Sequence, residues 1–175
     1  YLEDCISRQD SAGGVIECRV KGMPAGVGEP VFDKLDASLA KAMLSIGAVK
    51  GFEIGDGFAA AQSFGSENND SFCTGRDGKI AKATNHAGGI LGGMSDGSDI
   101  ILRAAIKPTP SIARQQQTVN RDGEEIGISI KGRHDPIIVP RAVVVVEAMT
   151  AICVLDMILL GMTSRLDRIQ DFWKN

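Results

Sequence analysis

The chain has 175 residues, of which 43% are hydrophobic and 23% are charged, enough apolar material for one domain with a buried core. Its formal net charge of -3 and pI near 5.4 exclude a broad basic surface for nucleic acid or an anionic membrane, so any anion would need a local site. Its four cysteines form no Cys-x-x-Cys pair and, with only two histidines, do not supply the usual zinc ligands, so we expect reduced thiols, no metal and a cytoplasmic protein.

The chain begins without the basic and apolar regions of a secretory signal and without an initiator methionine, so we expect it to be part of a longer protein. The first predicted element is a strand over residues 15–21, where apolar and charged residues alternate as they do in a half-buried strand. Gly26 and Gly28 then suggest a dinucleotide fingerprint, but Val31 occupies the place of its third glycine. We therefore predict no dinucleotide site there.

A helix is predicted to begin at Glu29-Pro30, with proline in its first turn, and to end at Gly47. Its apolar residues recur at steps of three and four, so one face should lie in the core: Phe32, Leu35, Leu39, Met43 and Ile46. A short strand over residues 49–54 and a helix over residues 58–64 follow. The corner over residues 45–51 would expose backbone groups that a ligand could bind.

The region between residues 66 and 93 changes from polar to glycine-dense. Residues 66–79 are polar and aperiodic, so they are predicted to form an irregular loop, and we assign them no function. Residues 84–93 contain two pairs of glycines, which suit either close packing of backbones or a flat ligand. They lack the lysine and hydroxyl residue of a Walker motif. Asp96-Gly97 then predicts a hairpin turn.

A strand is predicted over residues 100–106, where apolar residues again alternate. It leads into Lys107-Pro108-Thr109-Pro110-Ser111, in which two prolines stiffen the backbone. A cation and two hydroxyl groups are thus presented with little entropy left to lose on binding. Such a segment suits a phosphate or a flavin tail, and it is equally compatible with a rigid turn whose polar side chains are solvated.

Residues 115–125 are predicted to form a polar loop, and isoleucines at alternate positions over residues 126–130 predict a strand with one buried face. This strand leads to Arg133-His134-Asp135, where a fixed cation, an imidazole and a carboxylate are adjacent in sequence. Placed between two apolar elements, this triplet is a candidate site for chemistry. The alternative is a polar surface loop.

The last long element is a helix over residues 142–160. It is apolar enough to suggest a membrane span, but Glu147 and Asp156 would be costly at bilayer depth, so we predict a buried core helix that Gly161 ends. Ser164 is predicted to cap a final amphipathic helix whose inward face carries Leu166, Ile169 and Trp173.

Several of these segments occur together, in unbroken order from about Gly13 to Leu160, in one known family. The matching segments are residues 13–17, 26–36, 51–58, 84–93, 107–112, 132–136 and 139–142. Taken together they closely resemble the C-terminal half of the chorismate synthase family. The combination is highly specific, although none of the single motifs is.

The resemblance implies an enzyme that converts 5-enolpyruvylshikimate 3-phosphate to chorismate and phosphate by a 1,4-elimination, with reduced FMN required although no net oxidation occurs. It also implies an α+β fold, part of a β-α-β sandwich, and a cytoplasmic homotetramer with NADP as an associated nucleotide. Residues 1–175 would be the C-terminal half of a single domain. The N-terminal half, with the catalytic histidines and most of the arginines that hold the substrate, would be absent.

The resemblance also assigns roles by position. Asp135 would lie near the flavin ring, help manage the proton on flavin N5 and be the catalytic residue, while Arg133 would meet both substrate and flavin. Gly47 replaces a usual Asn or Pro, so only its backbone could contact the cofactor. His86 and His134 do not match the family's catalytic histidines. The full set expected to contact FMN is Gly47, Ala48, Gly92, Lys107, Pro108, Thr109, Pro110, Ser111 and Arg133.

We accordingly expect this chain to be inactive, or nearly so, by itself. The alternative function is a non-catalytic structural or assembly module that retains oligomer interfaces without binding flavin. An unrelated phosphate-binding domain is disfavoured by the lack of a complete nucleotide motif. No nucleic-acid or membrane partner is expected.

Overall fold

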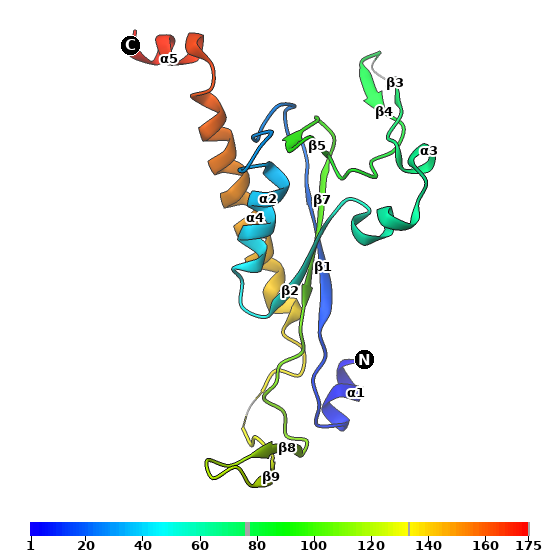
Figure 1. Cartoon of the computed structure of the whole chain (residues 1–175), viewed down its shortest axis with the longest axis vertical. Coiled ribbons are helices and arrows are strands. Elements are labelled where there is room, and N and C mark those ends of the chain that lie inside the picture. The colour runs from blue at the N-terminus through cyan, green and yellow to red at the C-terminus, as the bar shows by residue number, and fades with distance from the viewer. Residues whose placement is uncertain (76–77, 133, 175) are drawn as a thin grey trace.

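The computed structural model describes residues 1–75, 78–132 and 134–174, which form an elongated molecule built on a three-stranded antiparallel sheet (Figure 1). The strand order is β1-β7-β2, with β1 at Gly14–Val20, β7 at Ile100–Ile106 and β2 at Val49–Ile54. Helices α2 (Leu35–Leu44) and α4 (Val139–Met162) lie against one face of this sheet (Figure 1). All three strands were predicted, β1 and β7 from apolar alternation, and the predicted α+β class is confirmed.

The core lies between the sheet and the two helices. Leu35, Leu39 and Met43 on α2 are fully buried, as the three- and four-residue spacing predicted, and they pack with Leu102 of β7 and Val146 of α4. Each large side chain buried in this way contributes roughly 1.5 to 3 kcal/mol before conformational entropy is subtracted. Helix α2 is therefore scaffolding that fixes where its two ends lie.

The predicted start of α2 is wrong by six residues. The helix begins at Leu35, and Phe32, which was expected on its buried face, is 92% exposed with a positive φ of 62°. The reason is a tertiary contact: the Leu35 N–H donates to the carbonyl oxygen of Gly93 at 2.8 Å, and Gly28 lies so close that a Cβ there would be 2.5 Å from the same oxygen. Residues 28–34 therefore follow the turn at Gly93 instead of a helix.

Helix α4 confirms the predicted long helix, but the prediction that it is buried holds for one face only. Val146, Thr150, Val154 and Met157 are buried, and α4 contacts α2 and β1. Its other face exposes apolar side chains at Val143, Val144, Ile152, Leu155, Leu159 and Leu160. Among the described helices it is the one long and apolar enough to cross a membrane by length and composition.

Three small hairpins project from this framework: β3 (Phe72–Thr74) with β4 (Ile80–Lys82), β5 (Ile90–Leu91) with β6 (Met94–Ser95), and β8 (Gln116–Val119) with β9 (Glu125–Ile128). The predicted polar loops over residues 66–79 and 115–125 are therefore partly wrong, since the first also contains α3 (Gly65–Asn68). The turn predicted at Asp96-Gly97 lies after β6, and the hairpin reverses at Gly92-Gly93 instead.

The strand predicted over residues 126–130 exists as β9, but it has no buried face. Ile126 and Ile128 are 41% and 43% exposed, because β9 pairs only with β8 in a projecting hairpin. The period of two correctly predicted an extended backbone. It could not show whether another element covers the apolar side.

The remaining elements are α1 (Leu2–Ser7), a 3₁₀ helix η1 (Gly57–Gln62) in place of the predicted helix over residues 58–64, and α5 (Leu166–Trp173). The prediction that α5 packs inward is wrong, since Trp173 is 79% exposed and none of the helix is buried. Ser164 does not cap it: the N-cap is Arg165, and the Ser164 hydroxyl donates to the Gly161 carbonyl oxygen at 2.7 Å.

Candidate functional site

Three extended segments meet beyond the ends of β1 and β7, at the lower end of the molecule in Figure 1. Because Gly14 pairs with Ile106, the residues just before β1 stay beside those just after β7. The Ser11 hydroxyl donates to the Thr109 carbonyl oxygen at 2.6 Å, and the Ala12 N–H donates to the Pro136 carbonyl oxygen at 2.9 Å. The fold thus brings the Lys107–Ser111 segment to the segment that carries Asp135.

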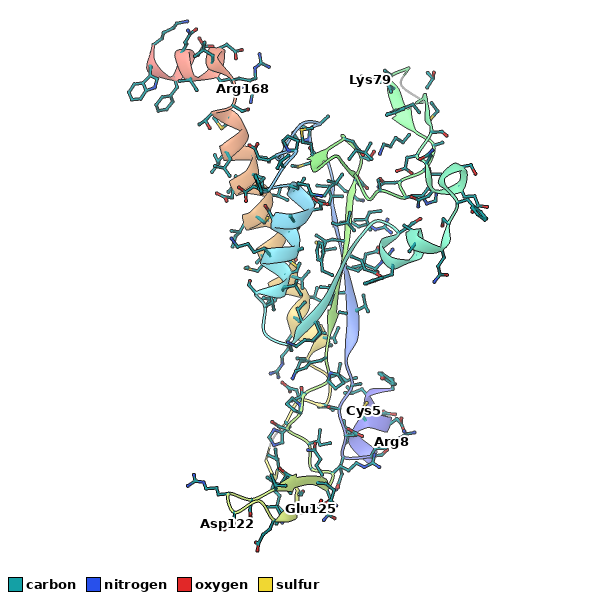
Figure 2. The ribbon with its side chains drawn as sticks, in the orientation of Figure 1. Cys5, Arg8, Lys79, Asp122, Glu125 and Arg168 are labelled. Atoms are coloured by element: carbon teal, nitrogen blue, oxygen red, sulfur yellow. The ribbon has the colours of Figure 1, made fainter. Side chains whose placement is uncertain are left out.

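A pocket of about 180 Å³ lies between these segments and α1. Ser111 and Asp135, two of the predicted site residues, both line it, together with Cys5 of α1 and Asp10. Figure 2 shows α1, marked by Cys5 and Arg8, at the same end of the molecule as the β8–β9 hairpin, marked by Glu125 and Asp122. Ser111 and Asp135 are far apart in the sequence, and the pocket brings them together.

Asp135 is held by an ion pair at the start of α4. Its Oδ2 atom lies 2.6 Å from Nη1 of Arg141, in the first turn of that helix. The Arg141 side chain is largely exposed, so the pair adds little to the free energy of unfolding and serves mainly to orient the carboxylate.

The corner between α2 and β2 also reaches this end of the sheet. The Lys107 N–H donates to the carbonyl oxygen of Ala48 at 2.9 Å, because Val49 pairs with Ile106 across β2 and β7. Ala48 has a positive φ of 70°, and a Cβ added at Gly47 would meet no atom within 4 Å. Gly47, Ala48 and Lys107, all predicted to contact a cofactor, therefore lie together at one corner of the sheet. The backbone at Gly47 is open to solvent there.

Thr109 supplies a structural reason to expect a ligand at this segment. Its Oγ1 atom is buried and, among the described residues, has no hydrogen-bond partner. A buried hydroxyl without a partner costs roughly 1 to 3 kcal/mol, so a rotation of the Thr109 side chain that brings the hydroxyl to a ligand atom would recover that free energy. The predicted cofactor segment thus carries a polar group that no described residue uses.

One predicted cofactor residue, Gly92, is not brought to this place. Gly92 lies in the β5–β6 turn, which touches the N-terminal end of α2 through the hydrogen bond from Leu35 N–H to Gly93. The open corner at Ala48 follows the other end of the same helix. Arg133 lies outside the described residues, so its predicted contacts with flavin and substrate stay predictions.

Sequence reasoning missed a buried ionic cluster far from the corner. The ammonium group of Lys82 pairs with Asp70 and Asp96, and all three side chains are nearly inaccessible to solvent. Burial would raise the pKa of Asp70, but hydrogen bonds from the Ala87 N–H, the Thr84 hydroxyl and the His86 N–H, together with the Lys82 charge, outweigh it and lower that pKa to about 2. The cluster holds the start of the glycine-dense segment over residues 84–93 in place. Of the two roles considered for that segment, packing of backbones and binding of a flat ligand, these contacts favour packing.

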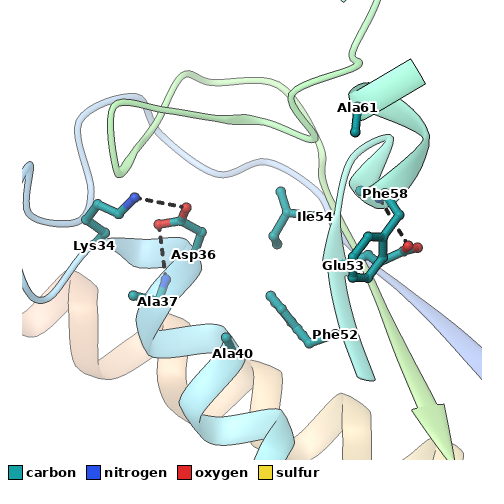
Figure 3. Close-up of a pocket in the computed structure, with 10 residues that line it drawn as sticks. Lys34, Asp36, Ala37, Ala40, Phe52, Glu53, Ile54, Phe58 and Ala61 are labelled. Carbon is teal, nitrogen blue, oxygen red and sulfur yellow. Dashed lines mark hydrogen bonds and ion pairs between the residues drawn. The ribbon is translucent and has the colours of Figure 1, made fainter. Parts of the chain in front are cut away.

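His86 is tied to the same region, because its Nδ1 atom lies 2.6 Å from Oδ2 of Asp56. A more open pocket of about 450 Å³ lies between α2 and η1 (Figure 3). Its polar residues already pair with each other or with the backbone: Lys34 with Asp36 at 3.5 Å, and Glu53 with the Phe58 N–H at 3.2 Å. None of the predicted site residues lines this pocket.

Comparisons with known proteins agree with one another. A model of the family described as chorismate synthase matches residues 1–159. The chain is 66% identical over 174 residues to the chorismate synthase of Lachnoclostridium phytofermentans, covering 99% of this chain and 47% of that protein. It is 62% identical over 155 residues to that of Archaeoglobus fulgidus, covering 88% of this chain and 43% of that protein.

A crystal structure of chorismate synthase superposes with a TM-score of 0.74 at 31% identity, covering 98% of this chain and 46% of that chain. The chain therefore spans about half the length of the curated relatives it matches.

Proposed function

The chain belongs to the chorismate synthase family, and we propose from this premise that it supplies the C-terminal part of a lyase that forms chorismate and phosphate from 5-enolpyruvylshikimate 3-phosphate by a 1,4-elimination. The observation that carries the proposal is the meeting of Ala48, Lys107–Ser111 and Asp135 at one end of the sheet. These groups lie far apart in sequence, and they match the residue types that a phosphate-bearing flavin and a leaving phosphate require.

The residues of this corner have separable roles in the proposal. The Lys107 ammonium group would neutralise phosphate charge, the Thr109 hydroxyl would bond to FMN, and the open backbone at Gly47 and Ala48 would lie along it. Asp135, oriented by Arg141, would hold or return a proton beside the flavin ring. When bound, reduced FMN supplies electron density to the allylic carbon from which phosphate departs.

Titration of the chain with FMN tests this cofactor site. We expect saturable binding that Lys107→Ala weakens at least about 10-fold, since a hydrogen bond to a charged group contributes roughly 1.5 to 3 kcal/mol. Lys21→Ala, which removes an exposed lysine just past the opposite end of β1, should leave the affinity unchanged. Equal affinity in the wild-type chain and the Lys107 variant would overturn the assignment.

We further propose that the chain alone does not turn over substrate. It spans about half the length of its relatives, and the family resemblance implies that the catalytic histidines and most of the substrate-binding arginines lie in the half that this chain does not match. An anaerobic assay with reduced FMN and 5-enolpyruvylshikimate 3-phosphate should therefore yield no chorismate. Substantial turnover would refute the claim. Family membership also supports a cytoplasmic homotetramer with NADP as an associated nucleotide for the intact protein.

The second candidate function is a non-catalytic assembly module. The exposed apolar face of α4 favours it, because such a face suits a contact with another chain or with further segments of the same protein. Measurement of mass in solution together with the FMN titration separates the two candidates. Oligomers that bind no FMN would support the module, whereas binding lost in the Lys107 variant supports the flavin site.

A further inference from the structure

A short segment before β1 links both parts of the candidate site. The Ser11 hydroxyl donates to the Thr109 carbonyl oxygen at 2.6 Å, and the Ala12 N–H donates to the Pro136 carbonyl oxygen at 2.9 Å. Ala12 also forms a parallel bridge with Ile137. Residues 9–13 therefore contact the Lys107–Ser111 segment on one side and the neighbours of Asp135 on the other.

This segment lies flush against the proline-rich one. A Cβ placed on Gly13 would be 2.3 Å from the carbonyl oxygen of Ile106 and 3.1 Å from Cδ of Pro108, so no side chain fits there. The segment is also tied at its other end, since the Arg114 N–H donates to the Gln9 carbonyl oxygen at 3.0 Å. The position of the Ser11 hydroxyl is thus set by backbone contacts on both sides.

Asp10 adds a polar constraint to the same segment. Its Oδ1 atom accepts the Ser11 N–H at 2.8 Å, and its Oδ2 atom accepts a hydrogen bond from Nη1 of Arg114 at 3.3 Å. The backbone and the side chain of Ser11 therefore both have partners, and its hydroxyl has a defined direction toward Thr109.

The contact falls on Thr109, the residue of the proline-rich segment whose buried hydroxyl lacks a hydrogen-bond partner among the described residues. Pro108 and Pro110 have fixed φ angles, and a residue that precedes proline is restricted to extended conformations, so Thr109 can move mainly by rocking of its peptide planes. A bond from Ser11 to the Thr109 carbonyl oxygen restrains that motion. It therefore helps to fix where the unpartnered Oγ1 atom of Thr109 lies.

We propose that Ser11 is a positioning residue for the cofactor site, which acts through Thr109 and itself touches neither cofactor nor substrate. The proposal rests on the proposed function, because the site that Ser11 shapes is the proposed FMN site. It adds a residue to which neither the sequence motifs nor the family resemblance assigned a role.

The test compares Ser11→Ala with Ser11→Thr, which keeps the hydroxyl, and with Ser129→Ala. The Ser129 hydroxyl makes the same kind of bond, to the carbonyl oxygen of Ala113 at 2.5 Å, two residues beyond the end of the proline-rich segment. In the chain without FMN, Ser11→Ala should shift the NMR signals of the Thr109 carbonyl carbon, which loses its hydrogen bond, and of the Thr109 side-chain methyl group, but not the amide signal of Lys107, whose N–H is bonded to Ala48. In Ser11→Thr and Ser129→Ala the Thr109 signals should stay as they are in the wild-type chain.

In FMN titrations, Ser11→Ala should weaken binding about 3- to 10-fold, the equivalent of one neutral hydrogen bond, and Ser11→Thr should restore it. Shifted Thr109 signals with unchanged FMN affinity would overturn the positioning role, and so would an equal loss of affinity in Ser129→Ala. If the wild-type chain bound no FMN, the proposed cofactor site would fail, while unchanged Thr109 signals in Ser11→Ala would separately refute the role of Ser11.

Discussion

Lys82 is a buried cation between two carboxylates, a combination that holds the region near His86 in place. Replacing Lys82 by Met would leave Asp70 and Asp96 buried without their counter-ion. Loss of one partner of a buried ion pair costs about 3 to 5 kcal/mol, so we expect a decrease of that size in the free energy of unfolding. Urea titration measures it, and Lys50→Met at an exposed position of β2 is the control, with a change below about 0.5 kcal/mol.

Asp70 makes the stability depend on acid. Its folded pKa of about 2 is below the value of 3.8 for the free group, so the folded state binds fewer protons than the unfolded state between these values. The contribution is fully present above about pH 4 and is lost as the pH falls toward 2. Unfolding followed from pH 6 to pH 2 should show a loss on the order of 2 kcal/mol from this group.

The variant Asp70→Asn gives the matching comparison for that acid dependence. It should be less stable at pH 6, and its stability should fall less than that of the wild-type chain between pH 4 and pH 2. Asp96, whose pKa is also lowered despite its burial because it bonds to Lys82, would retain part of the dependence. A variant with the same acid profile as the wild-type chain would contradict the assignment to Asp70.

At the scale of single residues, the sequence predicted what periodicity controls and missed what tertiary contacts control. Leu39 and Met43 are buried because helical spacing places them on one face. Phe32 shares that spacing, yet it lies outside the helix because Gly93 accepts the first helical N–H. Nothing in the sequence indicated that Lys82 is buried in an ion pair, because Asp70 and Asp96 come from separate segments that show only a polar composition.

Among the elements, α2 packs against both α4 and strand β2 of the sheet. Leu39 is fully buried, so Leu39→Ala should lower the free energy of unfolding by about 2 to 5 kcal/mol through lost contacts and a cavity. Leu44→Ala, on the same helix at a residue that is 53% exposed, should cost less than about 1 kcal/mol. Chemical denaturation of both variants checks this, and similar losses would contradict the assignment of the core.

Strands β1 and β7 were predictable because each buries one face, which makes apolar residues alternate. Of the β8–β9 hairpin only the β9 strand was predicted, because the hairpin is stabilised locally. Gln116 pairs with Ile128 in its ladder, and Oδ1 of Asn120 accepts the N–H groups of Asp122 and Glu124 in its turn. Polar residues that form a hairpin through such contacts look like an irregular loop in the sequence. The two halves of the candidate site lie on either side of this hairpin in the sequence, so the family resemblance could link them but the residue pattern by itself could not.

Across the whole molecule, the exposed face of α4 is the feature that the sequence could not show. A continuous apolar run is compatible with a helix covered on all sides and with one covered on a single side. In this structure one side of α4 is uncovered, and the chain spans about half the length of its relatives. The apolar run could not distinguish these two arrangements of the helix.

This exposed face should cause weak self-association. Sedimentation of the chain is expected to show a mass that rises with concentration, and the double variant Ile152→Glu, Leu155→Glu should shift it toward the monomer because both side chains lie on that face. Gln117→Glu with Thr118→Glu adds the same charge on the β8–β9 hairpin and should not alter it. A monomer at all concentrations would contradict this expectation.

The most direct test of the account replaces the 174 aligned residues of the 66% identical relative with this chain and measures chorismate formation with reduced FMN. If this chain supplies the proposed cofactor residues and Asp135 to the active site, the chimera should form chorismate. Asp135→Asn within the chimera should remove most of that activity while the protein stays folded. A folded, FMN-binding chimera that forms no chorismate, or an Asp135→Asn chimera as active as its parent, would contradict the account.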